Sequence, residues 1–220
     1  MNTPGHAVIN LALLSHLSPQ ANLAIVCGAV LPDLPIFGFY MWAKFVDRLP
    51  EREIWQEAYL QPRIQTVVAT FHSIPIALGC GLVSYLCGWE IAQIICLSCL
   101  LHSLEDIPVH NHDAHRHFFP LSNYRFISPF SYWDSRHYGN IVAAIELSLV
   151  FAMTLWVFPR VSSISGQILL IVANLYYWLG YFTFYLRKRH QHPCQIEKTL
   201  EKALENTLDE SESAAFAERK

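Results

Sequence analysis

The residues most able to do chemistry lie close together between His102 and His117, in the sequence HSLEDIPVHNHDAHRH. Four of the 11 histidines of the chain fall within residues 110–117. Neutral imidazole nitrogens and carboxylate oxygens are common ligands of Zn²⁺ and related divalent ions. The tract directly follows an apolar, helix-like segment that ends at Leu101. It therefore predicts a metal site, with zinc as the favoured ion, at the surface of a membrane.

His102 and Asp106 have the spacing that places two side chains one turn apart on the same face of a helix. An imidazole and a carboxylate in this arrangement can share one ion. Pro108 is expected to end the helix, so His110 belongs to the loop that follows. Even in an unbroken helix, His102 and His110 would be about 12 Å apart, which is too far for one ion. The spacing therefore requires either a bridging carboxylate from Asp106 or a second metal ion.

The tract continues as a loop in which possible metal ligands recur at short intervals. These candidate ligands are His110, His112, Asp113, His115 and His117. Asp113 and Arg116 could also orient the ligands through hydrogen bonds. The alternative is a solvated His-rich loop with only incidental affinity for metal. The aromatic, non-repetitive sequence around the loop favours a built site.

Three more polar residues lie at the ends of apolar segments, and each could contribute a ligand. They are His6 near the start of the chain, Asp33 in the sequence LPD, and His72 in the sequence FHS. Helical bundles can present ligands from several helices toward one pocket. Taken singly, each of these residues could equally be a helix cap or an interfacial residue. Because the pattern recurs, we expect the three to converge on the His102–His117 tract.

The composition favours a membrane protein. Hydrophobic residues make up 53% of the 220 residues and charged residues only 15%, against about 25% charged in ordinary soluble domains. A net charge of −3 without a basic stripe argues against a nucleic-acid partner. Most of the cysteines lie inside apolar segments, where they are expected to act as small hydrophobic residues. That expectation includes Cys96 and Cys99, although their spacing also occurs in redox and zinc motifs.

Several segments are candidates to cross the membrane. Residues 167–186 carry no formal charge over 20 residues, which is the length needed to cross about 30 Å of hydrocarbon. The basic residues 187–189 follow directly and predict a cytoplasmic location for that end. Residues 141–158, with Glu146 as their one charge, are the next candidate, and the short linker 159–166 makes the two segments antiparallel neighbours. Residues 74–101 form either one tilted span or two helices hinged near Glu90, and a buried helical hairpin is a further alternative.

The remaining segments complete an all-α interpretation. Residues 7–31 should form two short helices that meet near Ser18, and Pro50 should open a helix over EREIWQEAYL. Residues 118–140 resemble an ordered loop. We therefore expect one compact helical membrane domain over 1–194, with about two to four embedded helices and the His-rich loop at its surface. Residues 195–220 repeat an apolar residue every four positions, which predicts an amphipathic helical tail with a frayed end. That tail could contact a partner protein.

The order of these motifs resembles a bacterial family of membrane-bound metal-dependent hydrolases, and more loosely zinc-dependent phospholipase C. The resemblance covers roughly residues 1–140 and implies an all-α fold with a centre of His and Asp ligands. Carried over by motif, the ligands would be His6, Asp33, His72, His102 and Asp106. Phospholipase C also has a later His-x-x-x-Glu pair, which this chain lacks because His137 and Glu146 are nine residues apart. A complete trinuclear site is therefore not expected.

The end of the aromatic loop could contact a substrate. Trp133 could form a wall of the site, Asp134 could orient a ligand, and Arg136 could bind an anion, with Arg116 and His137 beside them. The competing interpretation is an interfacial aromatic belt with its Arg and His at the level of the lipid headgroups. The sequence does not separate the two.

These observations lead to a hydrolase hypothesis. The chain would be a multi-pass protein of the inner membrane whose site faces the cytoplasm and acts on a phosphoester or another ester, for example of a membrane lipid. Bound metal would lower the pKa of a water molecule. Asp106 would act as a bridging ligand, and Glu105 or Asp106 as the general base.

Two other functions are compatible with the sequence. One is a non-catalytic membrane protein that senses or moves a metal, or that tethers a partner through residues 195–220. The other is a redox protein that uses Cys96 and Cys99, which would require these thiols at an exposed helix N-terminus. The hydrolase hypothesis requires that His6, Asp33, His72, His102 and Asp106 converge on one point.

Overall fold

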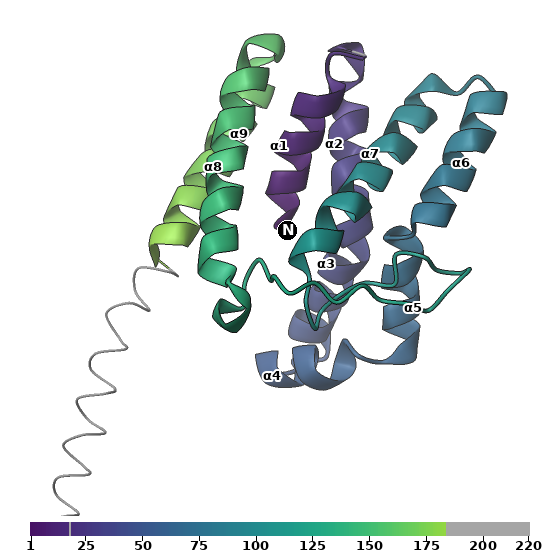
Figure 1. The fold of residues 1–220 in the computed structure, drawn as a ribbon, viewed down its shortest axis with the longest axis vertical. Coiled ribbons are helices and arrows are strands. Elements are labelled where there is room, and N and C mark those ends of the chain that lie inside the picture. The colour runs from purple at the N-terminus through teal and green to yellow at the C-terminus, as the bar shows by residue number, and fades with distance from the viewer. Residues whose placement is uncertain (18, 184–220) are drawn as a thin grey trace, which may run out of the picture. The chain divides into compact units, whose positions relative to one another are not determined.

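The computed structural model describes residues 1–17 and 19–183, and within these residues the regular structure is entirely helical (Figure 1). The chain divides into two compact units, Met1–Leu175 and Tyr176–Lys220. The candidate site lies wholly in the first unit. The expected all-α class is confirmed. The predicted tail helix at 195–220 and the basic residues 187–189 lie outside the described residues.

The first apolar segment forms two short helices, as the sequence predicts. Helix α1 spans Thr3–Leu14 and begins with Pro4 in its first turn, where the missing N–H of proline costs no helical hydrogen bond. After a short turn, a single 3₁₀ turn at Pro19–Ala21 leads into α2, which spans Asn22–Val30. Both helices pack against α7.

Helix α7, which spans Glu90–Asp106, lies at the centre of this unit. Gly28 of α2 approaches it so closely that an added Cβ would lie 2.7 Å from Ser98 Cβ and would also collide with the carbonyl oxygen of Ile95. Asn10 of α1 donates to the Ser98 carbonyl and hydroxyl oxygens, both at 2.9 Å, and the Ser98 hydroxyl donates to the Ile25 carbonyl at 2.6 Å. These buried polar contacts join α1, α2 and α7.

Residues 74–101 form two helices, which excludes the single tilted span among the alternatives left open by the sequence. Helix α6 spans Ile74–Leu86 and packs beside α7 (Figure 1). The hinge between them contains Gly88 with a φ of +69°, a left-handed conformation that favours glycine. Ser73 caps the start of α6 by accepting a hydrogen bond from the backbone N–H of Ile76 at 3.1 Å.

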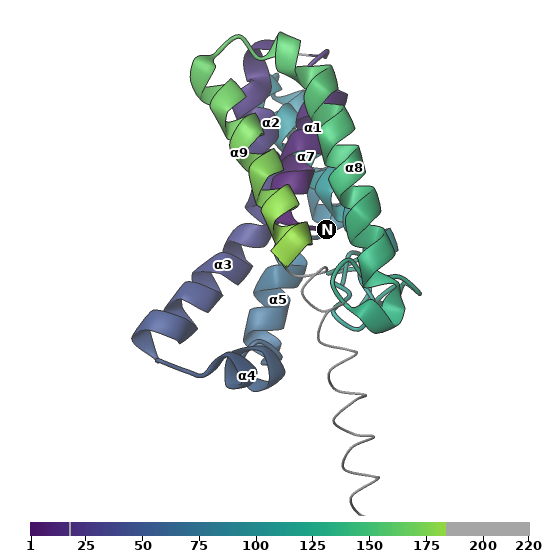
Figure 2. The same ribbon diagram turned by 90° about the vertical axis from the view of Figure 1, so that its left-hand side faces the viewer.

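The segment between α2 and α6 consists of short helices and helical turns (Figure 2). A 3₁₀ turn at Leu31–Asp33 continues into α3, Leu34–Met41, and a π-helical turn, Trp42–Val46. The helix predicted after Pro50 is present as the short α4, Glu51–Glu53, followed by a π-helical turn at Ile54–Ala58. Helix α5, Pro62–Phe71, then brings the chain back toward Asp33, because His72 at the end of this helix lies close to the Asp33 carboxylate.

The chain after α7 forms the ordered loop that the sequence predicts. A 3₁₀ turn at Ile107–Val109 follows α7, as expected from Pro108. The loop then runs to a 3₁₀ turn at Ser135–His137. The chain next forms α8, Gly139–Val157, a 3₁₀ turn, Phe158–Arg160, and α9, Ile164–Tyr181.

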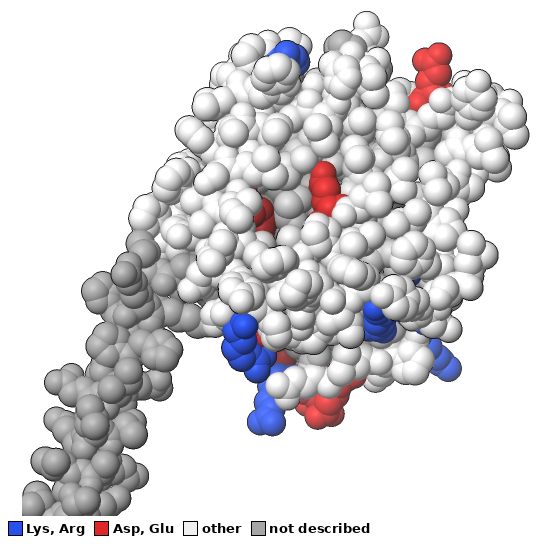
Figure 3. Space-filling view, viewed as in Figure 1, with Lys and Arg blue, Asp and Glu red and all other residues white. Residues whose placement is uncertain are grey.

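Within the described residues, three helical segments are long and apolar enough to cross a membrane, namely Asn22–Val46, Glu90–Val109 and Gly139–Arg160. The pair α5 and α6, bent by 44°, would add a fourth if it acts as one broken span. Figure 3 shows a face that is mostly without charged groups apart from a few Asp or Glu, with most of the visible Lys and Arg gathered at the lower edge. The predicted span at 167–186 lies partly outside the described residues, and its described part belongs to α9. Glu146, noted as a charge at membrane depth, is buried on α8.

Candidate metal centre

Five predicted ligands lie close together in the fold, and each lies at or near the end of a helical element. His6 is in the first turns of α1, Asp33 ends the 3₁₀ turn after α2, and His72 caps the end of α5. His102 and Asp106 occupy the last turns of α7. All but Asp33 are almost completely buried. The five side chains therefore form overlapping groups of three possible ligands, each of which includes His102 or Asp106.

The first group of possible ligands contains Asp33, His72 and His102. Asp33 Oδ1 lies 3.4 Å from His72 Nε2 and 3.6 Å from His102 Nε2. Asp106 Oδ2 lies 3.2 Å from His102 Nε2 and 3.8 Å from His72 Nε2. One atom from each of Asp33, His72 and His102 lies within 4.8 Å of the others, so the three could hold one ion.

The orientation of the two histidine rings supports this assignment. His72 Nδ1 lies 2.9 Å from the Val68 carbonyl oxygen, and His102 Nδ1 lies 2.6 Å from the Ala29 carbonyl oxygen. A carbonyl can only accept, so each Nδ1 carries a proton, and in the neutral ring each Nε2 then presents a lone pair. Both Nε2 atoms are buried without a hydrogen-bond partner among the described residues. Metal-ligating histidines are commonly oriented in this way by a carbonyl on the other nitrogen.

A second group of imidazoles, from His6 and His110, lies beside the other oxygen of Asp106, Oδ1. Asp106 Oδ1 lies 3.0 Å from His6 Nε2 and 3.1 Å from His110 Nε2. The α-amino group of Met1 is 2.7 Å from the same oxygen. His6, His102 and Asp106 also satisfy the distance requirement for a shared ion, and the rings of His6 and His102 stack at 3.7 Å. Asp106 thus faces both groups and has the bridging position that the spacing required.

Glu105 orients His6 and keeps one oxygen free. Its Oε2 lies 2.7 Å from His6 Nδ1, which directs Nε2 of that ring toward Asp106. Its Oε1 is buried and has no hydrogen-bond partner in the described part of the chain. Burial lowers the pKa of His6, but the carboxylates of Asp106 and Glu105 outweigh this and raise it to about 9. A proton therefore competes with a metal ion for this imidazole.

The later histidines of the tract lie beside these groups. His115 forms a further possible ligand group with His72 and Asp106, and its ring lies 4.1 Å from the His72 ring. His117 Nδ1 lies 3.2 Å from the His72 carbonyl oxygen, so it fixes the break between α5 and α6. Burial holds the pKa of His115 well below its usual range and lowers that of His117 to about 4. Both rings are therefore neutral at physiological pH.

The other predicted residues lie around the mouth of the site or away from it. Asp113 Oδ2 accepts from Trp133 Nε1 at 2.9 Å and lies 3.0 Å from His110 Nδ1, so Asp113 orients a ligand. Arg116 instead contacts Asn123 and Thr66. His112, Asp134, Arg136 and His137 gather in a separate surface cluster. The structure thus divides the predicted set between a buried centre and the loop that borders it.

Two further contacts were not anticipated from the sequence. The hydroxyl of Thr3 donates to Asp33 Oδ2, which leaves Oδ1 facing the histidines. The backbone N–H of Asn2 donates to Glu146 Oε1 at 2.8 Å and attaches the start of α1 to α8. The TPGH sequence signals the start of a helix but gives no information on which distant carboxylate it contacts.

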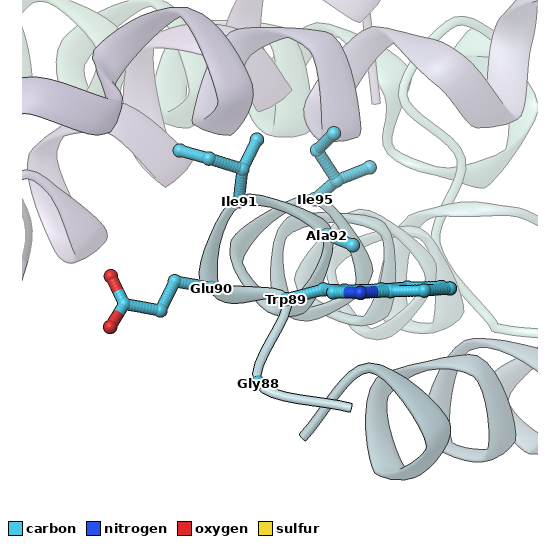
Figure 4. A pocket seen from close by; sticks show the side chains of 6 residues that line it. All are labelled: Gly88, Trp89, Glu90, Ile91, Ala92 and Ile95. Atoms are coloured by element: carbon cyan, nitrogen blue, oxygen red, sulfur yellow. The ribbon is translucent and has the colours of Figure 1, made fainter. Parts of the chain in front are cut away.

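Neither a pocket at the α6–α7 hinge nor the cysteine pair belongs to this centre. The pocket lies at the hinge between α6 and α7 and is lined by Gly88, Trp89, Glu90, Ile91, Ala92 and Ile95 (Figure 4). Glu90 and Asp106 are at opposite ends of α7, about 24 Å apart along its axis. Cys96 and Cys99 lie in the middle of α7, away from its N-terminus, so the condition for a redox pair is not met.

The fold and this cluster define a class: an all-α protein with helices long and apolar enough to cross a membrane and with buried His and Asp groups that could hold a metal ion. Comparison with known protein families, curated proteins and solved structures gave no match to this chain.

Proposed function

We propose that the chain is a membrane-bound metal-dependent hydrolase that acts on a phosphoester or another ester at the membrane surface. The observation that carries this proposal is the pair of buried Nε2 lone pairs of His72 and His102, which face the carboxylates of Asp33 and Asp106. Unpaired buried polar atoms are costly unless they are held for a ligand. A divalent cation is the ligand that this set of donors would satisfy.

The donor set favours zinc among the common divalent ions. Imidazole nitrogens combined with carboxylate oxygens suit Zn²⁺, whereas Mg²⁺ and Ca²⁺ prefer sites built from oxygen alone. A bound ion of this kind supplies an activated water and polarises the oxygen of an ester. His72, His102 and Asp33 would hold it on one side of Asp106, and His6 and His110 would lie on the other side.

The two adjacent carboxylates of α7 are suited to different roles. Both oxygens of Asp106 face imidazoles, so its lone pairs are committed to a bridging ligand role. Glu105 uses one oxygen for His6 and keeps the other free in a buried setting. Of the two candidates for general base, Glu105 is therefore the one that could accept a proton from water without giving up a ligand contact.

The distribution of charge supports a cytoplasmic site. Seven of the eight Lys and Arg residues in the described part of the chain occur in the segments on the site side of the helices: Lys44, Arg48, Arg52, Arg63, Arg116, Arg125 and Arg136. Only Arg160 follows the far end of α8. An excess of Lys and Arg marks the cytoplasmic side of membrane proteins. We therefore propose an inner-membrane protein with its site at the cytoplasmic face, where lipid headgroups are within reach.

Metal analysis and hydrolysis assays on one preparation test the proposal. Detergent-purified protein should contain a divalent metal and should hydrolyse bis(p-nitrophenyl) phosphate or p-nitrophenyl acetate. The variants His102→Ala and Asp33→Asn should lose both properties, whereas His16→Ala, in an exposed residue just beyond α1, should keep both. Unchanged metal content in both site variants would refute the centre. Metal that depends on these residues, without turnover of phosphate or carboxylate esters, would instead support the non-catalytic metal-binding alternative.

A further inference from the structure

A separate cluster of possible ligands, His112, Asp134 and His137, lies on the surface loop between α7 and α8. His137 Nδ1 lies 3.3 Å from Asp134 Oδ2, and His112 Nδ1 lies 4.0 Å from the same oxygen. One atom from each of the three residues lies within 4.8 Å of the others. None of the three belongs to the ligand groups of the buried centre. The cluster is therefore a separate feature of the fold.

The backbone around Asp134 holds the carboxylate in a defined position. The Asp134 carbonyl accepts hydrogen bonds from the N–H groups of His137 at 2.9 Å and Gly139 at 3.0 Å. A Cβ on Gly139 would lie 2.7 Å from this carbonyl group, and Tyr138 adopts a left-handed φ of +61°. The Asp134 N–H also donates to the hydroxyl of Ser131 at 3.2 Å. A tight turn thus fixes Asp134 and His137 relative to each other.

The two histidines are placed so that an ion could reach them. The His112 and His137 side chains are 48% and 37% exposed, whereas the Asp134 side chain is only 6% exposed. The ring of His112 packs against the edge of Trp133 at 5.2 Å, which restricts its position. An ion on the solvent side of Asp134 could bind all three residues and keep water in its remaining positions.

Arg136 forms an ion pair with the Asp134 carboxylate, and a metal ion bound there would have to displace it. Its guanidinium group donates to both Asp134 oxygens, at 2.8 and 3.1 Å. The Arg136 side chain is 77% exposed, so it can move into solvent without losing packing. The Asp134 side chain is only 6% exposed and the pair is bidentate, so a divalent ion with two imidazole ligands has to compete with this arginine.

We propose that His112, Asp134 and His137 form a second divalent-metal site, distinct from the buried centre and open to solvent on one side. Two imidazole nitrogens and one carboxylate favour Zn²⁺, Ni²⁺ or Cu²⁺ over Mg²⁺ and Ca²⁺. The site does not depend on the proposed hydrolase activity, since none of its ligands contacts the buried groups directly.

Metal binding at this site would join the two ends of the loop between α7 and α8. The ion would join His112 to residues more than twenty positions later, so it would fix the two ends of the loop to each other. Asp113, next to His112, contacts both His110 and Trp133. Binding at the surface would therefore steady the segment that carries His110 and His115 to the buried centre. The role that we assign to this ion is to fasten the loop rather than to react.

Metal titration of the full chain in detergent tests the proposal. Ni²⁺ is added to wild type and to His112→Ala and His137→Asn, and bound metal is counted by mass spectrometry together with hydrogen exchange of residues 110–137. We expect each variant to bind one ion fewer than wild type, and added Ni²⁺ to slow exchange in the loop of wild type only. The buried ligands should remain occupied in both variants, which separates this result from failure of the hydrolase centre.

Two matched variants make the test decisive. Arg136→Ala removes the competing guanidinium, so it should tighten binding at the surface site by about fivefold or more. His16→Ala removes an exposed histidine outside the cluster and should change nothing. Equal metal content in wild type, His112→Ala and His137→Asn would overturn the proposal. An equal loss in His16→Ala would also overturn it, because the ion would then be bound by scattered surface histidines.

Discussion

His102 Nε2 lies 3.2 Å from Asp106 Oδ2, one helical turn further along α7. The other oxygen of the same carboxylate lies 3.0 Å from His6 Nε2 and 3.1 Å from His110 Nε2. Asp106 therefore lies between imidazoles that belong to different parts of the fold, one on each side of its carboxylate. If either set holds an ion, the charge of Asp106 contributes to it.

The shared position of Asp106 predicts an unequal effect of two substitutions. Asp106→Asn keeps the size of the side chain but removes its charge, so it should lower bound metal on both sides of the residue. His110→Ala should spare the group of Asp33, His72 and His102. Elemental analysis of the purified proteins measures the difference. Equal losses in the two variants would contradict a bridging role for Asp106.

Glu105→Gln separates a proton-transfer role from a structural role. The amide can still accept a hydrogen bond from His6 Nδ1 but cannot take up a proton at neutral pH. We expect ester hydrolysis to fall by about 10²–10⁴-fold, with metal content reduced far less. Glu53→Gln, on α4, is the matched control and should leave both unchanged. A parallel loss of metal and activity would assign Glu105 to positioning His6 alone.

Gly28→Ala tests the close approach of α2 and α7. Its methyl group would collide with the Ile95 carbonyl and lie 2.7 Å from Ser98 Cβ, so the two helices would have to separate. We expect the free energy of unfolding to fall by about 1–3 kcal/mol. Gly79→Ala on α6 is the control, because nothing lies within 4 Å of its added methyl, and it should stabilise the helix by about 0.5–1 kcal/mol. Thermal unfolding in detergent measures both, and similar midpoints would contradict the packing described.

His117 should make the fold sensitive to acid. Burial lowers the pKa of His117 from its ordinary value of 6.5 to about 4 in the folded chain, so the unfolded chain binds more protons between these two values. Its contribution is therefore complete above pH 6.5 and is lost as the pH falls toward 4, with a total of about 3 kcal/mol. Wild type should lose more stability than His117→Asn between pH 7 and pH 5. Parallel pH profiles of the two unfolding midpoints would show that the imidazole is not buried in its neutral form.

The local features of this fold could be predicted from the sequence because they depend on neighbouring residues. Pro108 ends α7 because it cannot continue the helix, and the turn near Gly88 divides the long apolar run into two helices. The expected distance between His102 and His110 in a helix likewise predicted that one ion could not bind both without a bridging Asp106, and that a second metal ion was the alternative. These inferences need only helix geometry and the chemistry of single residues.

The long-range contacts could not be predicted in the same way. Glu105 contacts His6 across 99 positions, and Asn2 contacts Glu146 across 144. These pairs depend on how α1 is placed between α7 and α8, and no periodicity in the sequence specifies that placement. His110 and His112 are two positions apart in one His-rich tract, so the sequence could not show that they belong to different clusters in the fold.

The position of the ligands at helix ends also determines where the chain can change in length. Gly28 is locked against α7, and only four residues separate it from Asp33. One residue inserted between them would rotate the aspartate by about 100° and move it by about 1.5 Å along the axis. The turn around Gly88, at the other end of α7, bears no ligand and could take an insertion without disturbing the centre. Natural variants of this protein should therefore differ in length at that turn and keep a constant spacing from Gly28 to Asp33.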